Sequence, residues 1–462
     1  ATMAIALIVP MTFTLPPVVS IGMLVGAYKG GCFGGSIPAI LLNTPGTPAA
    51  AATSLDGHEM AKKGQAHKAL KVSIYSSVCA DSISDIVLIL ISPPLALIAL
   101  KMGPPEMTGL IIFSLLIITA VAGQSLTKGL IAGVIGLLVG TIGLDPIMAT
   151  RRFGFGLSQL DEGIALMPML IGLFALSEFF INAEAILAKG KRTIVELGHK
   201  LEENRFTRQE KIACAKIIGM ASGIGTLLGA IPGIGPSISA FASYAQAKRM
   251  SKNPQDFGHG SVEGVAAAEA GNNAVAGSNL IPLLTLGIPG DIGAALLLGG
   301  FMIQGLHPGP MLFKENLDLI YAIFMSLLLA NVFNFIIAKQ YIKIASRITT
   351  ISKHYIYPGI LAFCLVGAYG FNQSIFDVWM TFLFGVLGYI LRRNQFPVAP
   401  LLIAFILEPI LESSFRQSLL ISRGSLGIFV THPISAAFLA LSLVGVCIIV
   451  KGVVNKQKIL GN

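Results

Sequence analysis

Charged side chains are scarce in this chain. They make up 12% of its 462 residues, whereas 54% of the residues are hydrophobic. A typical soluble domain carries about 25% charged residues, so too few charges remain to cover soluble domains of this total length. The abundance of apolar residues also excludes a disordered chain. The composition therefore predicts a polytopic membrane protein.

Recognisable metal, redox and hydrolase motifs are missing as well. The five cysteines show no CxxC spacing and the seven histidines no metal-ligand spacing, so we expect no disulfide scaffold, metal or cofactor. HExxH, GxSxG and GxGD do not occur, which argues against an intramembrane enzyme. The net charge of +9 comes from short basic clusters between apolar runs. This pattern is typical of membrane loops and not of a face that binds nucleic acid.

Long apolar runs are what the chain has in their place. A helix needs about 20 apolar residues to cross the bilayer core, and the runs 129–144, 320–338 and 433–450 contain no charge. Together with less regular runs, they predict an all-α polytopic membrane protein. We expect about 10 to 12 membrane segments, some of them re-entrant or broken helical hairpins.

The segment 189–211 is the most polar stretch of the chain. It separates two groups of apolar runs. We therefore expect a first repeat over 1–188, a cytoplasmic linker over 189–211 and a second repeat over 212–462. Basic clusters, such as the one at 62–71, should face the cytoplasm together with the linker, because positive charge favours that side.

Two short sequence segments recur in the two halves of the chain. ILLNTPGTPAAA at 40–51 matches LTLGIPGDIGAA at 284–295, and QSL at 124–126 matches QSI at 373–375, with offsets of 244 and 249 residues. One duplication would explain both pairs. Because the loop after the first segment is basic and the loop after the second is nearly neutral, we expect the repeats to be inverted, as in many secondary transporters. Duplicated channels and structural proteins share this symmetry, so it does not decide between these functions.

The chain opens inside an apolar run. The counterpart of Pro232, placed by the same offset, would lie upstream of Ala1. We therefore expect the natural chain to extend upstream by roughly 35 to 55 residues, the length of one helix and one hairpin arm. That extension should carry a Pro-Gly motif of its own.

Three Pro-Gly motifs, at 43–48, 231–236 and 287–291, interrupt apolar runs. Proline removes a backbone donor and glycine permits a tight reversal. Thr47 and Asp291 suit the start of a new helix. The motifs therefore predict discontinuous helices, whose free N–H groups suit a carboxylate and whose free carbonyls suit a cation. The alternative is a proline kink packed against glycines, with no ligand.

The residues around these motifs form the candidate site. We expect substrate to contact Ser36, Asn43, Thr44, Gly46, Thr47, Asn272, Asn273, Gly287 and Gly290. We expect a coupling cation to contact Asp291, Ile288 and Asn273. The two roles are separated because an acidic residue repels a polycarboxylate unless a cation lies between them.

Two further groups of polar residues lie in apolar runs. Asp81 and Asp85 share one helical face with Ser77, and they could line a cation path or equally lie near the membrane interface. Glu408 and Glu412 with Arg416 suggest a structural charge network at a helix end.

Four segments carry a resemblance to a known family. They are GGSIPAILLNTPGTPAAAATSLDGHEMAKKGQAHKAL at 34–70, GLFALSE at 172–178, GTLLGAIPGIGP at 225–236 and NLIPLLTLGIPGD at 279–291. They closely resemble segments of the large membrane subunit of the tripartite tricarboxylate transporters (the TctA family). One departure is local, since Tyr28-Lys29 replaces the more frequent paired tyrosines.

The resemblance implies a multi-pass carrier in the bacterial inner membrane. Its partners would be a small membrane subunit, the lipid bilayer and a periplasmic substrate-binding protein that delivers citrate or another carboxylate. We therefore expect a secondary active transporter subunit that imports tricarboxylate- or dicarboxylate-type anions by symport with sodium or protons and alternating access. A carrier for another small organic anion, a channel-like subunit and a structural subunit are the alternatives.

Overall fold

The computed structural model describes residues 2–121, 125–188, 206–348 and 353–460. These residues are helical apart from turns and one antiparallel hairpin of β1 (Gly143–Leu144) and β2 (Arg151–Arg152). Six helical segments are long and apolar enough to cross a membrane, and six shorter apolar helices accompany them. The all-helical, multi-pass architecture is thus confirmed. The number of membrane segments and the inverted repeats remain predictions.

The helices follow the predicted breaks closely. The first half contains α1 (Thr2–Ile8), η1 (Val9–Thr12), α2 (Pro17–Gly34), α3 (Ser36–Leu42), α4 (Ala50–Lys62), α5 (Ala66–Ala99), α6 (Pro104–Val121), α7 (Leu126–Gly140), η2 (Ser158–Leu160), α8 (Leu166–Leu170), the π-helical η3 (Ile171–Leu176) and α9 (Ser177–Ala188). The second half contains α10 (Arg208–Gly229), α11 (Pro236–Met250), η4 (Pro254–Asp256), α12 (Val262–Ser278), α13 (Leu280–Leu286), α14 (Ile292–Ile303), α15 (Leu312–Glu315), α16 (Leu317–Ile348), α17 (Lys353–Asn372), α18 (Ile375–Arg393), α19 (Val398–Ile421), α20 (Ile428–Thr431) and α21 (Pro433–Leu460).

Most of the predicted linker, residues 189–205, lies outside the described residues. Its last residues belong to α10. Thr207 and Glu210 form a capping box there, each side chain accepting a hydrogen bond from the backbone N–H of the other residue, which fixes the start of this helix.

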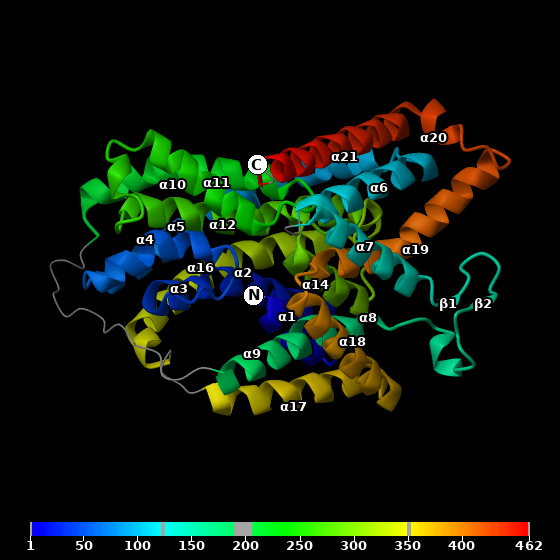
Figure 1. Ribbon diagram of the computed structural model, residues 1–462, viewed down its shortest axis with the longest axis horizontal. Helices are drawn as coiled ribbons and strands as arrows, with labels where there is room; N and C mark the ends of the chain where they lie inside the picture. Colours follow the sequence, from blue (N-terminus) through cyan, green and yellow to red (C-terminus); the bar gives the residue numbers. More distant parts are fainter. Residues whose placement is uncertain (1, 122–124, 189–205, 349–352, 461–462) are drawn as a thin grey trace.

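Helix α12 is the centre of one half of the molecule. It packs against α5, α10, α11 and α4 (Figure 1). Its sequence is rich in alanine and glycine, and every residue from Gly264 to Ser278 is buried. Small side chains let helices approach closely in membranes, and a Cβ atom at Gly277 would collide with Ser84 and Asp85 of α5. The polar side chains of α12 are therefore held inside the protein.

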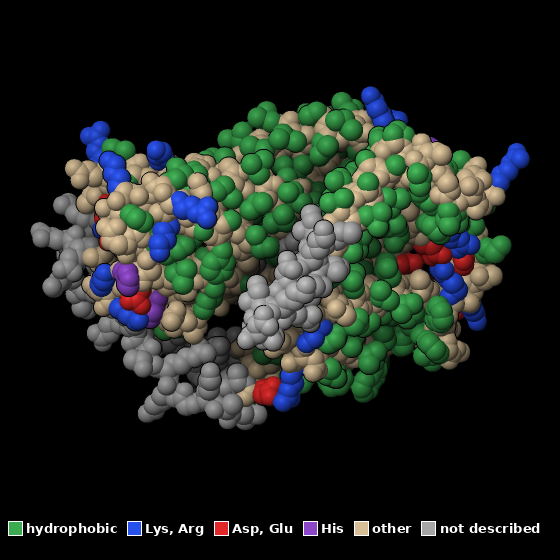
Figure 2. Space-filling model, turned by 45° about the horizontal axis from the view of Figure 1, so that its top comes forward, with side chains coloured by type: hydrophobic (Ala, Val, Ile, Leu, Met, Phe, Trp, Pro, Cys, Tyr) green, Lys and Arg blue, Asp and Glu red, His purple; other side chains and the backbone are tan. Residues whose placement is uncertain are grey.

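The remaining helices extend the molecule along its long axis. Helix α19 packs on α6 and α7, α21 on α6, and α18 on η3 and α9. Figure 1 shows α4 toward one end of this axis and β1, β2 and α20 at the other. Figure 2 shows hydrophobic side chains spread over the middle of the visible face, with Lys and Arg side chains mostly toward the two ends. This distribution suits helices that cross a bilayer roughly along this axis.

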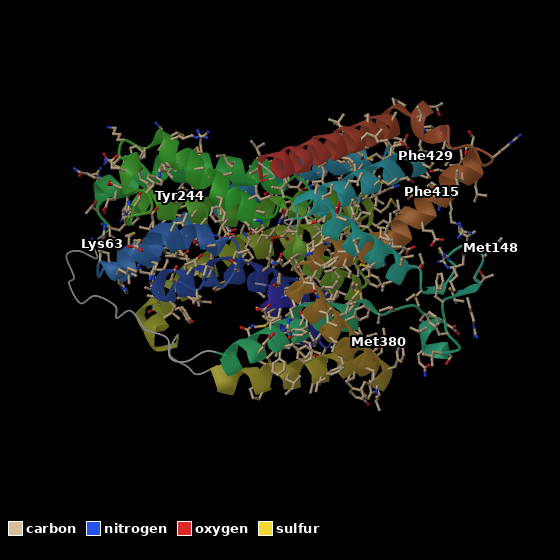
Figure 3. The ribbon with its side chains drawn as sticks, viewed as in Figure 1. Lys63, Met148, Tyr244, Met380, Phe415 and Phe429 are labelled. Atoms are coloured by element: carbon tan, nitrogen blue, oxygen red, sulfur yellow. The ribbon has the colours of Figure 1, made fainter. Side chains whose placement is uncertain are left out.

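Basic loops from both halves meet at the α4 end. Lys63 Nζ donates to the carbonyl oxygen of His259 at 2.6 Å, and Lys68 of α5 pairs with Glu210 of α10. Lys63 and Tyr244 lie at this end in Figure 3. The structure thus places the basic segment 62–71 beside the end of the predicted linker.

A charge network lies at the other end. Arg152 donates two hydrogen bonds to Glu412, at 2.8 and 3.0 Å, and Arg416 donates to Asp145 at 2.7 Å and to Glu412 at 2.9 Å. The amide N–H of Met148 and then the Arg416 guanidinium hold the pKa of Asp145 well below its usual range. The predicted network is present, but α19 continues beyond Arg416. The network therefore joins the hairpin of β1 and β2 to the side of α19 and does not lie at the end of that helix.

Candidate functional site

Each Pro-Gly motif lies between two separate helices. The first motif joins α3 to α4, the second joins α10 to α11, and the third joins α13 to α14. In each case one helix ends before the motif and a new helix begins after it, so the motifs are breaks and not kinks within continuous helices. Discontinuous helices were predicted from proline and glycine alone, and this prediction is confirmed.

The first and third breaks have the same local geometry. Asn43 and Gly287 both take the left-handed conformation, with φ of 51° and 73°, which asparagine and glycine tolerate better than other residues. The N–H of the following residue donates to the carbonyl oxygen of Pro38 in one loop and of Pro282 in the other, at 3.2 Å in both. These residues are related by the same 244-residue offset, which supports a common origin for the two segments.

Asp291 is the N-cap of α14, as predicted, whereas the N-cap of α4 is Ala49, and Thr47 contacts the start of α4 from two positions further upstream. Thr47 Oγ1 accepts a hydrogen bond from the N–H of Ala50 at 3.3 Å at the start of α4. Asp291 Oδ1 accepts one from the N–H of Ala294 at 2.7 Å at the start of α14. In both helices a side chain therefore satisfies one of the N–H groups that the first turn leaves free.

Helix α11 begins differently. Its N-cap residue is Gly235, so no side chain caps it, and Pro236 occupies its first position. The next two residues, Ser237 and Ile238, both line a cavity. Since the first-turn N–H groups have no partner within the helix, the start of α11 offers free backbone donors to that cavity.

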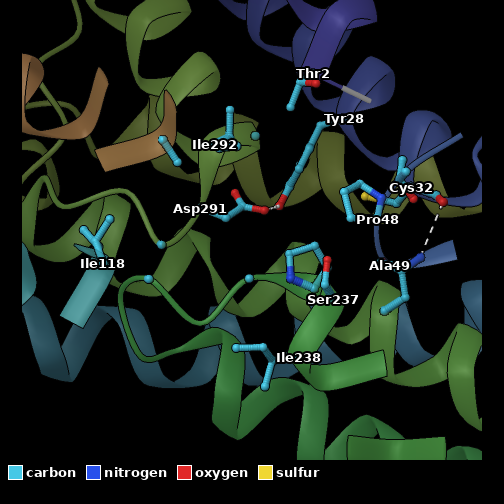
Figure 4. Close-up of a pocket in the computed structure, with 18 of the residues that line it drawn as sticks. Thr2, Tyr28, Cys32, Pro48, Ala49, Ile118, Ser237, Ile238, Asp291 and Ile292 are labelled. Atoms are coloured by element: carbon cyan, nitrogen blue, oxygen red, sulfur yellow. Dashed lines mark hydrogen bonds between the residues drawn. The ribbon is translucent and has the colours of Figure 1, made fainter. Parts of the chain in front are cut away.

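All three breaks line this one cavity, whose volume is about 360 Å³ (Figure 4). Residues 46–49, 233, 235–238 and 290–293 contribute, together with side chains of α1, α2, α6, α12 and α19. The second and third breaks are also tied together, because the N–H of Gly233 donates to the carbonyl oxygen of Gly290 at 2.8 Å. The N-termini of α4, α11 and α14 thus converge on one space and favour an anion there.

The structure brings together about half of the predicted site residues. Those that line the cavity are Gly46, Thr47, Asn272, Gly290 and Asp291. Those that do not line it are Ser36, Asn43, Thr44, Asn273, Gly287 and Ile288. Asn43 and Gly287 shape their loops, whereas Ser36 and Asn273 are fully buried.

The lining residues that were not found from the sequence include Tyr28, Cys32 and Ser237. The Tyr28 hydroxyl donates to Asp291 Oδ2 at 3.5 Å and accepts from Asn279 Nδ2 at 3.3 Å. Figure 4 shows Tyr28 and Asp291 pointing toward each other. The 244-residue repeat offset could have identified Tyr28, because position 28 corresponds to position 272, and Asn272 was predicted as a site residue.

A buried polar layer lies between α4, α5 and α12. Thr53 Oγ1 and Ser77 Oγ donate to the Glu269 carboxylate, the second at 2.9 Å. Asn273 Nδ2 donates to Ser77 Oγ at 2.8 Å and to the Glu269 carbonyl oxygen at 3.0 Å. Asn273, predicted as a site residue, therefore belongs to this layer.

The layer continues to a buried lysine. Lys29 of α2 donates to Asp85 and, at 2.8 Å, to Asn331 Oδ1 of α16, and its Nζ lies 3.8 Å from Asp81 Oδ1. Asp81 and Asp85 are fully buried, so both side chains lie inside the protein, and the two alternatives for them, a cation path and a place near the membrane interface, both stay predictions. Among the described residues, no group of three or more His, Cys, Asp and Glu side chains is arranged to hold a metal ion.

Comparisons with known proteins agree with this architecture. The model of the family described as "Tripartite tricarboxylate transporter TctA family" matches residues 1–403. A protein of Agrobacterium vitis, described as "Uncharacterized 52.8 kDa protein in TAR-I ttuC' 3'region", is 39% identical over 97% of this chain and 88% of its own length. A second protein of that organism, "Uncharacterized protein in TAR-II ttuC' 3'region", is 43% identical over 49% of this chain and 92% of its own length. No solved structure matches at a significant level.

Proposed function

The chain belongs to the tripartite tricarboxylate transporter TctA family, and on that premise we propose that it carries carboxylate anions through the cavity between its three Pro-Gly breaks. It is a multi-pass membrane transporter subunit and not an enzyme. In the proposed system it lies in a bacterial inner membrane with a small membrane subunit. A periplasmic binding protein delivers a tricarboxylate such as citrate, or a dicarboxylate, and a sodium or proton gradient drives uptake.

The convergence of three helix N-termini on one cavity carries this proposal. A volume of about 360 Å³ lies in the range that small-molecule sites occupy. The uncapped start of α11 would bind one carboxylate through its free N–H groups. The Thr47 hydroxyl and the start of α4 would bind another. Gly46 and Gly290 would let the backbone approach the substrate closely.

Asp291 is the acidic residue at this cavity. A carboxylate substrate beside it would be repelled, so we assign Asp291 to a cation that accompanies the substrate. Ile288 would add its carbonyl oxygen from the same loop, and Asn273 would act from the layer behind the cavity. Alternating access would expose the cavity to one side of the membrane at a time, with the breaks serving as the moving tips.

Gly235 gives a direct test of the substrate site. A Cβ atom at Gly235 would meet only Asp291 Cβ, at 3.9 Å, so a side chain fits there. Gly235→Asp would place a carboxylate where we expect the substrate carboxylate, and it would cap α11. Gly235→Ala is the matched control, since it fills space without adding charge or a cap.

The measurement is uptake of radiolabelled citrate into proteoliposomes that contain the full chain, its small membrane subunit and the binding protein. We expect Gly235→Asp to reduce uptake by about tenfold or more and Gly235→Ala to retain it. Equal uptake by both variants would overturn the proposed site. Counterflow of labelled citrate against unlabelled citrate separates a carrier from a channel, which shows no counterflow.

A further inference from the structure

The buried polar layer behind the cavity carries more negative than positive charge. Lys29, Asp81, Asp85 and Glu269 are all fully buried, so three carboxylates face one ammonium group. Glu269 is satisfied by hydroxyl donors, and Lys29 is shared between Asp85 and Asn331. A buried charge without compensation is unfavourable. Asp81 is the one of the three that accepts no hydrogen bond from a described residue, and Lys29 Nζ comes no closer to it than 3.8 Å.

The hydrogen bonds in this layer leave oxygen atoms without donors. Both carboxylate oxygens of Asp81, one of Asp85 and the amide oxygen of Asn273 have no hydrogen-bond partner among the described residues. The orientation of the Asn273 amide is fixed, because its nitrogen donates to the carbonyl oxygen of Glu269, which can only accept. The Asn273 oxygen is therefore a genuine acceptor with no donor.

Asn273 and Asp81 are both neighbours of Ser77. Asn273 is bonded to Ser77, and Ser77 and Asp81 lie four residues apart on one face of α5, where side chains at this spacing are neighbours. Asp81 Oδ1 also lies 3.8 Å from Nζ of Lys29, which is the neighbour of Tyr28 on α2, and Tyr28 lines the cavity. The Asp81 carboxylate thus lies beside a helix that forms part of the cavity wall.

We infer that Asp81 and Asn273 hold a sodium ion in a second cation site, separate from Asp291. Oxygen-only ligand sets suit hard cations. A proton on Asp81 would supply one donor for the four oxygens that lack one, whereas a sodium ion can bind several oxygens at once. Lys29 stays bonded to Asp85 and Asn331. Calling this ion the coupling ion rests on the proposed function, but its binding does not.

The test measures sodium binding without substrate or partner proteins. The full chain in detergent is melted at increasing NaCl, with KCl and choline chloride at matched ionic strength. The melting temperature of the wild type is expected to rise with sodium and not with the other cations, because a ligand that binds only the folded state stabilises it. Asp81→Asn should abolish this sodium dependence. The same substitution at the buried Asp377 of α18 should leave it intact.

A second outcome separates a binding site from a purely structural ion pair. In sodium-free buffer, Asp81→Asn should melt above the wild type, because it removes an uncompensated buried charge. A merely structural Asp81–Lys29 pair predicts the opposite. Should Asp81→Asn not fold, Asn273→Ala leaves every charge in place and is expected to weaken the apparent sodium affinity by about tenfold or more.

The inference is overturned if sodium stabilises Asp81→Asn as it does the wild type, or if Asp291→Asn alone abolishes the effect. Stabilisation of the wild type by low pH with no response to sodium would assign a proton to Asp81 and would also overturn it. Citrate uptake that persists without any sodium effect on melting would reject this site and leave the proposed carrier standing. Sodium binding without citrate uptake would support this cation site and reject the proposed carrier function.

Discussion

Replacing Asp291 with asparagine separates two roles of one side chain. Asp291 Oδ1 accepts the N–H of Ala294 at 2.7 Å and so caps α14. An asparagine oxygen can accept the same hydrogen bond, and asparagine is as good an N-cap as aspartate. The contact of Oδ2 with the Tyr28 hydroxyl, at 3.5 Å, is too long to contribute much. We therefore expect Asp291→Asn to change the free energy of unfolding by less than about 0.5 kcal/mol, against about 1 kcal/mol for Asp291→Ala.

The effect on cation binding should be larger. Two unit charges about 4 Å apart interact by about 4 kcal/mol at an effective dielectric constant of about 20. Asp291 is partly exposed to the cavity, and screening by water reduces this by about half. A loss of about 2 kcal/mol corresponds to a fall of about 30-fold in the apparent affinity for the cation.

The assay is carboxylate uptake into proteoliposomes, with sodium and proton gradients imposed separately and the concentration of the driving cation varied. Melting temperatures of the same preparations report the stability of the fold. Asp377→Asn, the same substitution at a buried position of α18, is the matched control and should transport normally. If Asp291→Asn transports with an unchanged cation dependence, Asp291 is only a helix cap and its assignment to a cation is refuted.

Three other expectations can be measured independently. Gly46→Ala should reduce uptake and destabilise the fold by about 1 to 3 kcal/mol, because its Cβ would lie 2.9 Å from the backbone of Gly35, between α2 and α3. Gly26→Ala is the control and should be neutral, because its Cβ meets nothing within 4 Å. Equal behaviour of the two variants would contradict the close approach of Gly46 to Gly35. Cysteines at Lys63 and His307 should react with an impermeant maleimide from opposite sides of the membrane, and labelling from one side would refute the inverted repeat. The depressed pKa of Asp145 means that its contribution to stability is complete above the unfolded-state pKa of about 3.9 and is lost as the pH falls through the lower folded-state pKa. Melting temperatures should therefore fall on acidification below pH 4 (about the unfolded pKa) more steeply in the wild type than in Asp145→Asn, and parallel curves would show that the network is unimportant.

The sequence by itself determined the class of protein and the positions of its breaks. Scarce charge and long apolar runs specify a membrane protein, because the bilayer selects for composition along the whole chain. Proline, glycine and the capping residues Thr47 and Asp291 specify where helices end and begin again, because these preferences act within a single helical turn. Such local signals can be read without knowing the fold.

Only the tertiary structure decided which cavity and which distant side chains these local features contact. The second motif was identified as a break, yet the exposure of Ser237 to the shared cavity depends on how α11 packs against α12. The role of Lys29 likewise depends on α2 lying beside α5 and α16, which brings it to Asp85 and Asn331. These contacts join residues far apart in the sequence, with separations of 56 and 302. Helix α12 carries small residues on all sides, so no apolar stripe shows which neighbour it will face. Its partners are chosen by close packing of small residues, and that choice is not written in any local segment of the chain.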